Sequence, residues 1–218
     1  MDSDLDRFNF EREHHTRALI RLAGVDEAGR GPLAGPVVAA AAVLPAEWVE
    51  TGLPESLQRL NDSKKLTEKT REQLFAALHA EPEIHFGIGV IEAIVIDEIN
   101  ILQATHRAMN TALAQLSPPA AHALVDGLRV PTLAIPQTAI VKGDQKSFSI
   151  AAASILAKVT RDRIMREHDI RWPEYAFAKH KGYGTAAHLA ALSAHGACSI
   201  HRRSFAPVFA VQQKGARQ

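Results

Sequence analysis

Four acidic residues follow short apolar runs of the sequence. Asp26 and Glu27 come directly after one run, Asp126 follows a second, and Asp144 comes shortly after a third. Side chains at the ends of strands line the ligand sites of layered sheets, whereas a bare carboxylate inside a strand is too costly to bury. If the three strands are neighbours, the four carboxylates converge and repel one another unless a divalent cation offsets their charge.

This pattern indicates a particular metal chemistry. Oxygen ligands without nearby cysteine pairs favour Mg²⁺ or Mn²⁺ over zinc. Two such ions, about 4 Å apart, would activate a water molecule and stabilise the leaving oxygen of an in-line displacement at phosphorus. The alternative for any one of these acids is a structural role, in which the carboxylate caps a helix or a turn.

A glycine-rich segment, AGRGPLAG at residues 28–35, begins directly after the first two acids. Its spacing fits neither common nucleotide loop, because Pro36 stands where a Walker loop has lysine and the interval from Gly31 to Gly35 is too long for a dinucleotide fingerprint. Since glycine lacks Cβ, the segment allows a nucleic-acid strand to approach the backbone closely. A plain tight turn is the alternative.

The composition is that of a globular protein, with 46% hydrophobic residues and a net charge of +1. Residues 175–218 hold six basic side chains and four histidines but no Asp or Glu. An acid-free segment suggests a polyanionic partner, with an ordinary basic tail as the alternative. No run is long enough to span a membrane, and the acidic N-terminus is unlike a secretory signal. With a single cysteine and therefore no intrachain disulfide, the expected compartment is the reducing cytoplasm.

Strand and helix patterns alternate along the chain. Apolar runs predict strands over residues 22–27, 36–44, 85–91, 122–127 and 138–144, although the alanines of the second run fit a helix equally well. Helices are predicted over residues 67–80, 92–116, 147–170 and 185–195. Such alternation indicates an α/β or α+β layered fold.

The expected organisation is one domain over residues 1–218, because no linker separates two halves. A polar lead-in with the character of a frayed helix occupies residues 1–20, and the core extends over about residues 20–170. A basic, helical, substrate-binding extension is expected over about residues 171–210. We expect a monomer, since no repeating apolar stripe indicates a partner copy.

Eight segments between residue 22 and about residue 208 share a pattern with one known family. They are GVDEAGRGPLAGPVV, LNDSKKL, DEINILQATHRAM, LVDG, VKGD, SIAAASILAKVTRD, HKGYGT and HRRSF. In this combination the chain resembles the type 2 ribonuclease H family, which includes bacterial ribonuclease HII. The resemblance implies an α/β, ribonuclease H-like fold with a five-stranded mixed sheet flanked by helices and a C-terminal helical extension.

The resemblance also implies an activity. The expected enzyme is a metal-dependent endoribonuclease that cleaves the RNA strand of RNA–DNA hybrids and nicks duplex DNA 5′ to a single embedded ribonucleotide. The products carry 3′-hydroxyl and 5′-phosphate ends, and two Mg²⁺ or Mn²⁺ ions act with substrate bound. Such an enzyme would remove ribonucleotides and RNA primers during DNA replication and repair.

The four acids named above would be the catalytic residues and metal ligands in this resemblance. The Gly-Arg-Gly motif matches Gly29, Arg30 and Gly31, whose backbone is expected to contact the ribonucleotide 2′-hydroxyl and the junction phosphate. Tyr183 matches the residue expected to stack on the following sugar.

Several further residues are candidate contacts to the substrate's phosphate backbone. They are Ser63, Lys64, Lys65, Lys142, Lys146, Arg202 and Arg203. For the adjacent lysines of this set, an ordinary solvated pair is the alternative. Asp162 is expected to form a surface ion pair with a neighbouring arginine, or else to support the metal site. His180 as a general acid or base is a further alternative, and Cys198 is expected to be a small hydrophobic residue.

Two other classes of function stay open on the sequence. One is a nucleic-acid-binding module without catalysis, for which added Mg²⁺ would promote no cleavage. The other is an Mg²⁺-dependent enzyme acting on a small phosphorylated substrate, for which substrate affinity would depend weakly on salt.

Overall fold

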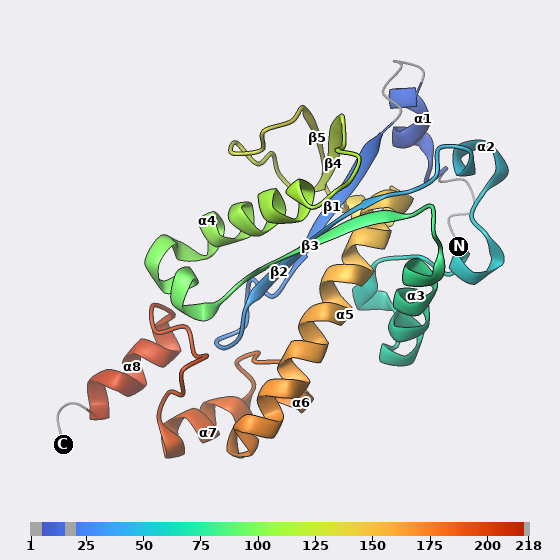
Figure 1. Ribbon diagram of the computed structural model, residues 1–218. Coiled ribbons are helices and arrows are strands. Elements are labelled where there is room, and N and C mark those ends of the chain that lie inside the picture. Colours follow the sequence, from blue (N-terminus) through green and yellow to red (C-terminus); the bar gives the residue numbers. More distant parts are fainter. Residues whose placement is uncertain (1–5, 16–20, 216–218) are drawn as a thin grey trace.

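The computed structural model describes residues 6–15 and 21–215 (Figure 1). Its centre is a five-stranded sheet in the order β3-β2-β1-β4-β5. The strands are β1 (Leu22–Ala28), β2 (Val37–Val43), β3 (His85–Ile91), β4 (His122–Asp126) and β5 (Gln137–Ile140). The first three strands pair antiparallel, whereas β1–β4 and β4–β5 pair parallel. The predicted mixed five-stranded sheet is confirmed, and the alanine-rich run is a strand.

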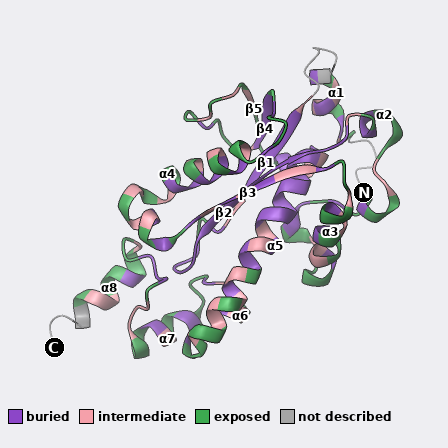
Figure 2. Cartoon of the chain, in the orientation of Figure 1, coloured by how far each residue is buried: buried purple, intermediate pink, exposed green. Residues whose placement is uncertain are grey.

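Helices cover both faces of this sheet (Figure 1). One face packs against α3 (Glu68–Ala80) and α5 (Phe148–Arg171), and the other against α4 (Ala93–Ala114). Successive residues of β2 therefore enter different cores: Val38 packs on the α3 and α5 side, and Val37 on the α4 side. This explains why β2 is apolar and buried along its whole length, as Figure 2 shows.

A glycine sets how closely α5 approaches the sheet. A Cβ placed at Gly24 of β1 would lie 2.0 Å from the backbone carbonyl carbon of Ser149 in the first turn of α5. The two backbones are therefore in direct contact, which side chains of ordinary size would prevent. The N-terminus of α5 is closed by Ser147, whose side chain accepts the N–H of Ile150.

Two predicted elements differ in detail from the structure. The long helix α4 consists of two parts that meet at Asn100 (φ 66°), whose side chain accepts the N–H groups of Leu102 and Gln103 and so caps the second part. The strand predicted over 138–144 ends at Ile140, because Lys142 adopts a left-handed conformation and begins a 3₁₀ turn over Gly143–Gln145.

Several short elements were not predicted from the sequence. They are α2 (Trp48–Thr51) and 3₁₀ turns at Glu55–Leu57, Ser63–Lys65 and Pro173–Tyr175. The short helices α6 (Phe177–His180) and α8 (Ala206–Gly215) lie in and next to the expected helical extension, and α1 (Asn9–His15) lies in the expected lead-in. The predicted helix α7 (Ala186–His195) gathers with α6 and α8 beyond the end of α5 (Figure 1). Of the expected lead-in, residues 1–5 and 16–20 lie outside the described residues. Within the described ranges, no helix has the length and apolar character to cross a bilayer.

Candidate active site

The parallel register of β1 and β4 places two of the predicted acids side by side. Val25 aligns with Val125, so Asp26 and Asp126 come next at the same edge of the sheet. Asp26 is 3% exposed, and its Oδ1 accepts the N–H of Glu27 at 2.6 Å. Burial, together with the negative charges of Glu27 and Asp126, raises the pKa of Asp26 well above its ordinary value.

The fourth acid, Asp144, reaches this edge from the turn after β5. The N–H of Gly143 donates to Asp126 Oδ1 at 2.6 Å, which fixes the turn against β4. Asp144 is buried, and burial together with the carboxylates of Asp62 and Asp126 raises its pKa to about 6. The structure thus brings the four predicted acids together.

A fifth carboxylate, Asp62, was missed by the sequence analysis. It precedes a 3₁₀ turn, where its Oδ1 accepts the N–H of Lys64 at 2.9 Å, and its Oδ2 accepts from Gln145 Nε2 at 3.3 Å. Burial opposes the charge of the Lys64 side chain, but Asp26, Asp144 and Asp62 outweigh it and raise the Lys64 pKa above its ordinary value. An ammonium group therefore lies within electrostatic reach of the acids.

The acids fit divalent ions by their chemistry, although they form no closed cage. Among the described residues, no three Asp, Glu, His or Cys side chains surround one point as metal ligands. Mg²⁺ usually keeps several water or substrate oxygens and takes only one or two carboxylates from the protein, so an open site is compatible with it. Buried carboxylates such as Asp26 and Asp144, whose pKa values are raised by burial and by neighbouring negative charges, are the groups that such an ion stabilises.

Two pockets open beside the acids, and Glu27 and Arg30 line both. The pocket that we call the loop pocket has a volume of about 240 Å³. Its lining comprises Glu27, Ala28, Gly29, Arg30, Gly31, Ser63, Lys64, Ser154, Lys158 and Tyr183. The α4 pocket, of about 400 Å³, lies between α4 and the segment 127–131 and also includes Asp126. The predicted Gly-Arg-Gly backbone and Tyr183 therefore share a pocket with Glu27, and Glu27 also lines the neighbouring pocket that includes Asp126.

A family model described as Ribonuclease HII matches residues 23–208 of this chain. The chain belongs to the ribonuclease HII family. The Ribonuclease HII of Ruminiclostridium cellulolyticum is 51% identical over 212 residues, which cover 95% of this chain and 80% of that protein. The solved structure of ribonuclease H2 from Pyrococcus horikoshii OT3 aligns with a TM-score of 0.75 at 26% identity, over 91% of this chain and 100% of that chain.

A more distant structure, Bst-RNase HIII in complex with Mn²⁺, shares the fold at a TM-score of 0.65 and 17% identity, over 92% of this chain and 71% of that one. The resemblance seen in the sequence is thereby confirmed, as is the fold. Membership of the ribonuclease HII family makes this chain a nuclease, that is, a hydrolase of phosphodiester bonds.

The position of Arg202 contradicts its predicted contact with the phosphate backbone of a substrate. Its side chain is 0% exposed, and its guanidinium donates to the carbonyl oxygens of Gly29 at 2.6 Å, Arg30 at 2.9 Å and Gly35 at 3.0 Å. A side chain enclosed in this way does not face a duplex, so the prediction that Arg202 contacts phosphate is wrong. Arg202 instead stabilises the glycine-rich loop through hydrogen bonds to its backbone carbonyl oxygens.

A second buried arginine, Arg161 of α5, holds the same loop. Its guanidinium donates to the carbonyl oxygens of Ala34, Pro36 and Lys181 at 3.1, 2.9 and 3.0 Å. Because Lys181 lies just before Tyr183, Arg161 also joins the loop to the segment that carries this tyrosine. The sequence offered no local signal for this role.

The other candidate phosphate contacts divide by position. Ser63 and Lys64 line the loop pocket, where the Ser63 hydroxyl is 2.8 Å from Ser154 Oγ. Ser154 and Lys158 were not predicted, although their spacing of four residues places both on one side of α5. Neither pocket includes the remaining candidates, which in the described structure are Lys65, Lys142, Lys146 and Arg203.

Asp162 requires correction. It is 3% exposed and pairs with Lys158 at 2.7 Å and Arg71 at 3.8 Å, so the ion pair is buried and its partners are not the adjacent arginines. Because Lys158 lines the loop pocket, Asp162 fixes a cation there.

Two other predictions concern His180 and Cys198 in the C-terminal segment. The His180 ring bonds to the carbonyl oxygen of Tyr175 and lines neither pocket, which removes the basis for a general acid or base. Cys198 is half-buried and packs against a small hydrophobic cluster that includes Tyr175 and Phe177, as expected, and its Sγ also lies 3.1 Å from His201 Nδ1.

Proposed function

We propose that this chain hydrolyses the RNA strand of RNA–DNA hybrids and nicks duplex DNA 5′ to a single embedded ribonucleotide, leaving 3′-hydroxyl and 5′-phosphate ends. The observation that carries the proposal is the loop pocket. It joins Glu27 of the acid cluster to the Gly29–Gly31 backbone and the exposed ring of Tyr183. A site that combines phosphodiester chemistry with close backbone approach to a sugar suits a ribonucleotide junction.

In this proposal, Asp26, Glu27, Asp126 and Asp144 hold two Mg²⁺ or Mn²⁺ ions. When bound, such ions would supply activation of the attacking water and charge neutralisation at the 3′ leaving oxygen. The protein's own contribution is then mainly binding and orientation.

Recognition of the ribonucleotide falls to the loop pocket in this proposal. The backbone of Gly29–Gly31 lies against the 2′-hydroxyl, and the Tyr183 ring stacks on the next sugar. Lys64 and Lys158, which line the same pocket, supply positive charge for the phosphates. The wider role that follows is removal of ribonucleotides and RNA primers from DNA, by a monomer in the cytoplasm.

The decisive experiment uses a DNA duplex with one embedded ribonucleotide and an all-DNA duplex of the same sequence. Each is incubated with the protein in Mg²⁺, in Mn²⁺ and in EDTA, and the products are mapped at nucleotide resolution. We expect one metal-dependent nick 5′ to the ribonucleotide and none in the all-DNA control. Binding without cleavage in both metals would overturn the catalytic assignment.

A further inference from the structure

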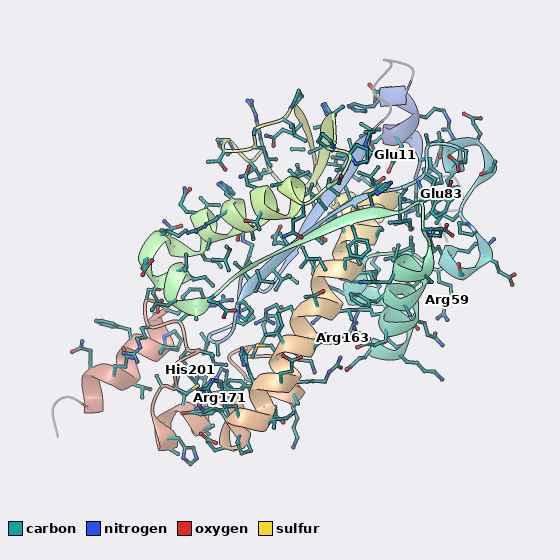
Figure 3. All side chains as sticks on the ribbon, viewed as in Figure 1. Glu11, Arg59, Glu83, Arg163, Arg171 and His201 are labelled. Carbon is teal, nitrogen blue, oxygen red and sulfur yellow. The ribbon has the colours of Figure 1, made fainter. Side chains whose placement is uncertain are left out.

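A chain of buried imidazoles lies directly behind Tyr183. His188 of α7 is 0% exposed and His201 is 1% exposed, and their Nε2 atoms are 3.0 Å apart. Figure 3 shows His201 at the end of the molecule formed by α6 and α7. Neither ring lines the loop pocket or the α4 pocket, so neither is in the chemistry described above.

The hydrogen-bond partners assign a proton to each ring. His201 Nδ1 accepts the N–H of Cys198 at 3.0 Å, so the His201 proton is on Nε2. His188 Nδ1 is 2.9 Å from the carbonyl oxygen of Tyr183, which only accepts, so the His188 proton is on Nδ1. The Nε2 of His188 is then the acceptor for His201. Both rings are neutral, and donation runs in one direction from Cys198 to Tyr183.

Burial supports these neutral forms. It lowers the pKa of His188, and burial together with the neighbouring His188 lowers the pKa of His201 to about 4. We call the series of hydrogen bonds from Cys198 through both rings to Tyr183 the relay. A proton added to either ring would turn an acceptor nitrogen into a donor facing another donor, so the relay forms only while both rings are uncharged.

The backbone of Tyr183 is held on both sides by this cluster. Its N–H donates to the carbonyl oxygen of His180 at 2.9 Å, and its carbonyl oxygen accepts from Thr185 N–H at 2.8 Å as well as from His188. The His180 ring stacks on the His188 ring, with centroids 4.6 Å apart, and accepts the N–H of Gly182 at 3.2 Å. The side chain of Tyr183, by contrast, is 46% exposed.

We propose that His188, supported by His201, is a positioning residue that fixes the Tyr183 ring for recognition of a ribonucleotide junction. An exposed ring has few packing contacts to orient it, so its direction depends on the backbone from which it projects. The relay fixes the orientation of the peptide group that follows Tyr183, and with it the direction in which the Tyr183 side chain leaves the backbone. This inference rests on the proposed function, in which Tyr183 stacks on the substrate.

Two substitutions at His188 separate positioning from simple packing. In His188→Asn the amide nitrogen can occupy the place of Nδ1 and still donate to the Tyr183 carbonyl. In His188→Gln the amide lies at the place of Nε2, and that donor is lost. We expect His188→Asn to retain kcat/KM on the single-ribonucleotide duplex within about twofold and His188→Gln to lose about tenfold, the effect of one hydrogen bond. His195→Gln, on the exposed side of the same helix, is the matched control and should equal the unsubstituted protein.

A double-mutant cycle with Tyr183→Ala shows whether the effect passes through the tyrosine. In the Tyr183→Ala background, His188→Gln should cause no further loss of kcat/KM. Additive losses would overturn the proposal, as would full activity of His188→Gln beside an impaired Tyr183→Ala. Failure of the unsubstituted protein to nick the duplex would instead overturn the proposed function. In that case, the Kd for the ribonucleotide duplex relative to that for the all-DNA duplex, measured in Ca²⁺, replaces kcat/KM in the same double-mutant cycle.

A second measurement needs no variant. Two-bond ¹H–¹⁵N correlation spectra of the ¹⁵N-histidine-labelled protein report which ring nitrogen carries the proton. We expect the Nδ1–H form for His188 and the Nε2–H form for His201 at neutral pH. The opposite assignment, or a charged ring, would overturn the relay.

Discussion

Arg161 and Arg202 donate hydrogen bonds to the same carbonyl oxygen, that of Pro36, at 2.9 and 3.1 Å. One arginine lies on α5 and the other follows α7, so two distant parts of the chain hold the glycine-rich loop. A guanidinium presents five N–H donors in a rigid fork, which suits a row of carbonyl oxygens. The conformation of the loop is therefore imposed by side chains outside it, which suits the proposed contact of its backbone with the substrate.

Arg202→Lys is expected to destabilise the fold and release the loop. Lysine keeps the positive charge but cannot serve all of the carbonyl oxygens that Arg202 contacts, which leaves buried acceptors unsatisfied. We expect a loss of about 3 kcal/mol in the free energy of unfolding, measured by urea denaturation. Arg203→Lys, at the neighbouring exposed position, should change it by less than about 0.5 kcal/mol. Equal effects of the two substitutions would contradict the assignment of Arg202.

Asp126→Asn should abolish turnover and leave duplex binding intact. The amide is nearly isosteric and still accepts the N–H of Gly143, but it loses the charge that a divalent ion needs. We expect cleavage of the ribonucleotide duplex to fall by several orders of magnitude, with Kd for the duplex changed less than about threefold. Parallel losses of binding and of rate would argue against a role confined to the metal ions.

Divalent ions should stabilise the folded chain against heat. At an ion concentration of about 100 times Kd, the gain in the free energy of unfolding is expected to be about 2.7 kcal/mol, and EDTA should reverse it. Calorimetry in MgCl₂ or MnCl₂, against KCl of equal ionic strength, measures the shift in Tm. Asp26→Asn should reduce that shift, because Asp26 is a proposed ligand. An undiminished shift in the variant would place the ion elsewhere.

The neutral imidazole of His201 predicts a pH dependence of stability. Burial and His188 lower its pKa to about 4, below the ordinary value of 6.5, so the unfolded chain binds more protons between these values. The contribution of His201 is complete above about pH 6.5 and is lost as pH falls toward about 4, by at most about 3 kcal/mol.

His201→Gln removes this titration while leaving His188 and His180 in place. The variant should show a flatter dependence of unfolding free energy on pH across that window, measured by urea denaturation at several pH values. Asp97, Glu98 and Arg203 line a pocket with His201 and are present in both proteins. Their charges therefore contribute alike to the two unfolding free energies and do not affect the difference between them. Identical slopes would show that His201 does not titrate with folding.

The sheet and the acid cluster were predictable because their determinants are local. A strand covered on both faces must be apolar throughout, and a carboxylate such as Asp126 then marks the point where burial ends. The same logic failed for Asp62 and Lys158, because neither residue follows an apolar strand and each reaches the site from outside the sheet. Nothing in their immediate neighbours indicates which distant group they face.

Arg202 and Arg203 show the limit of an argument from charge. The two are adjacent and chemically identical, yet one is enclosed and the other is exposed. The difference depends on carbonyl oxygens more than 160 residues away, such as that of Gly35. Charge in the acid-free segment indicated a polyanionic partner, but it could not say which side chains face outward.

The contact at Gly24 sets the distance between α5 and the sheet. α5 carries Ser154 and Lys158 on its route from the acid cluster to the loop, and its first turn rests on β1 without an intervening side chain. A single methyl group at Gly24 would push the first turn of α5 away from β1 and tilt the helix relative to the sheet. The width of the loop pocket between α5 and the end of β1 therefore depends on a residue at the base of the helix.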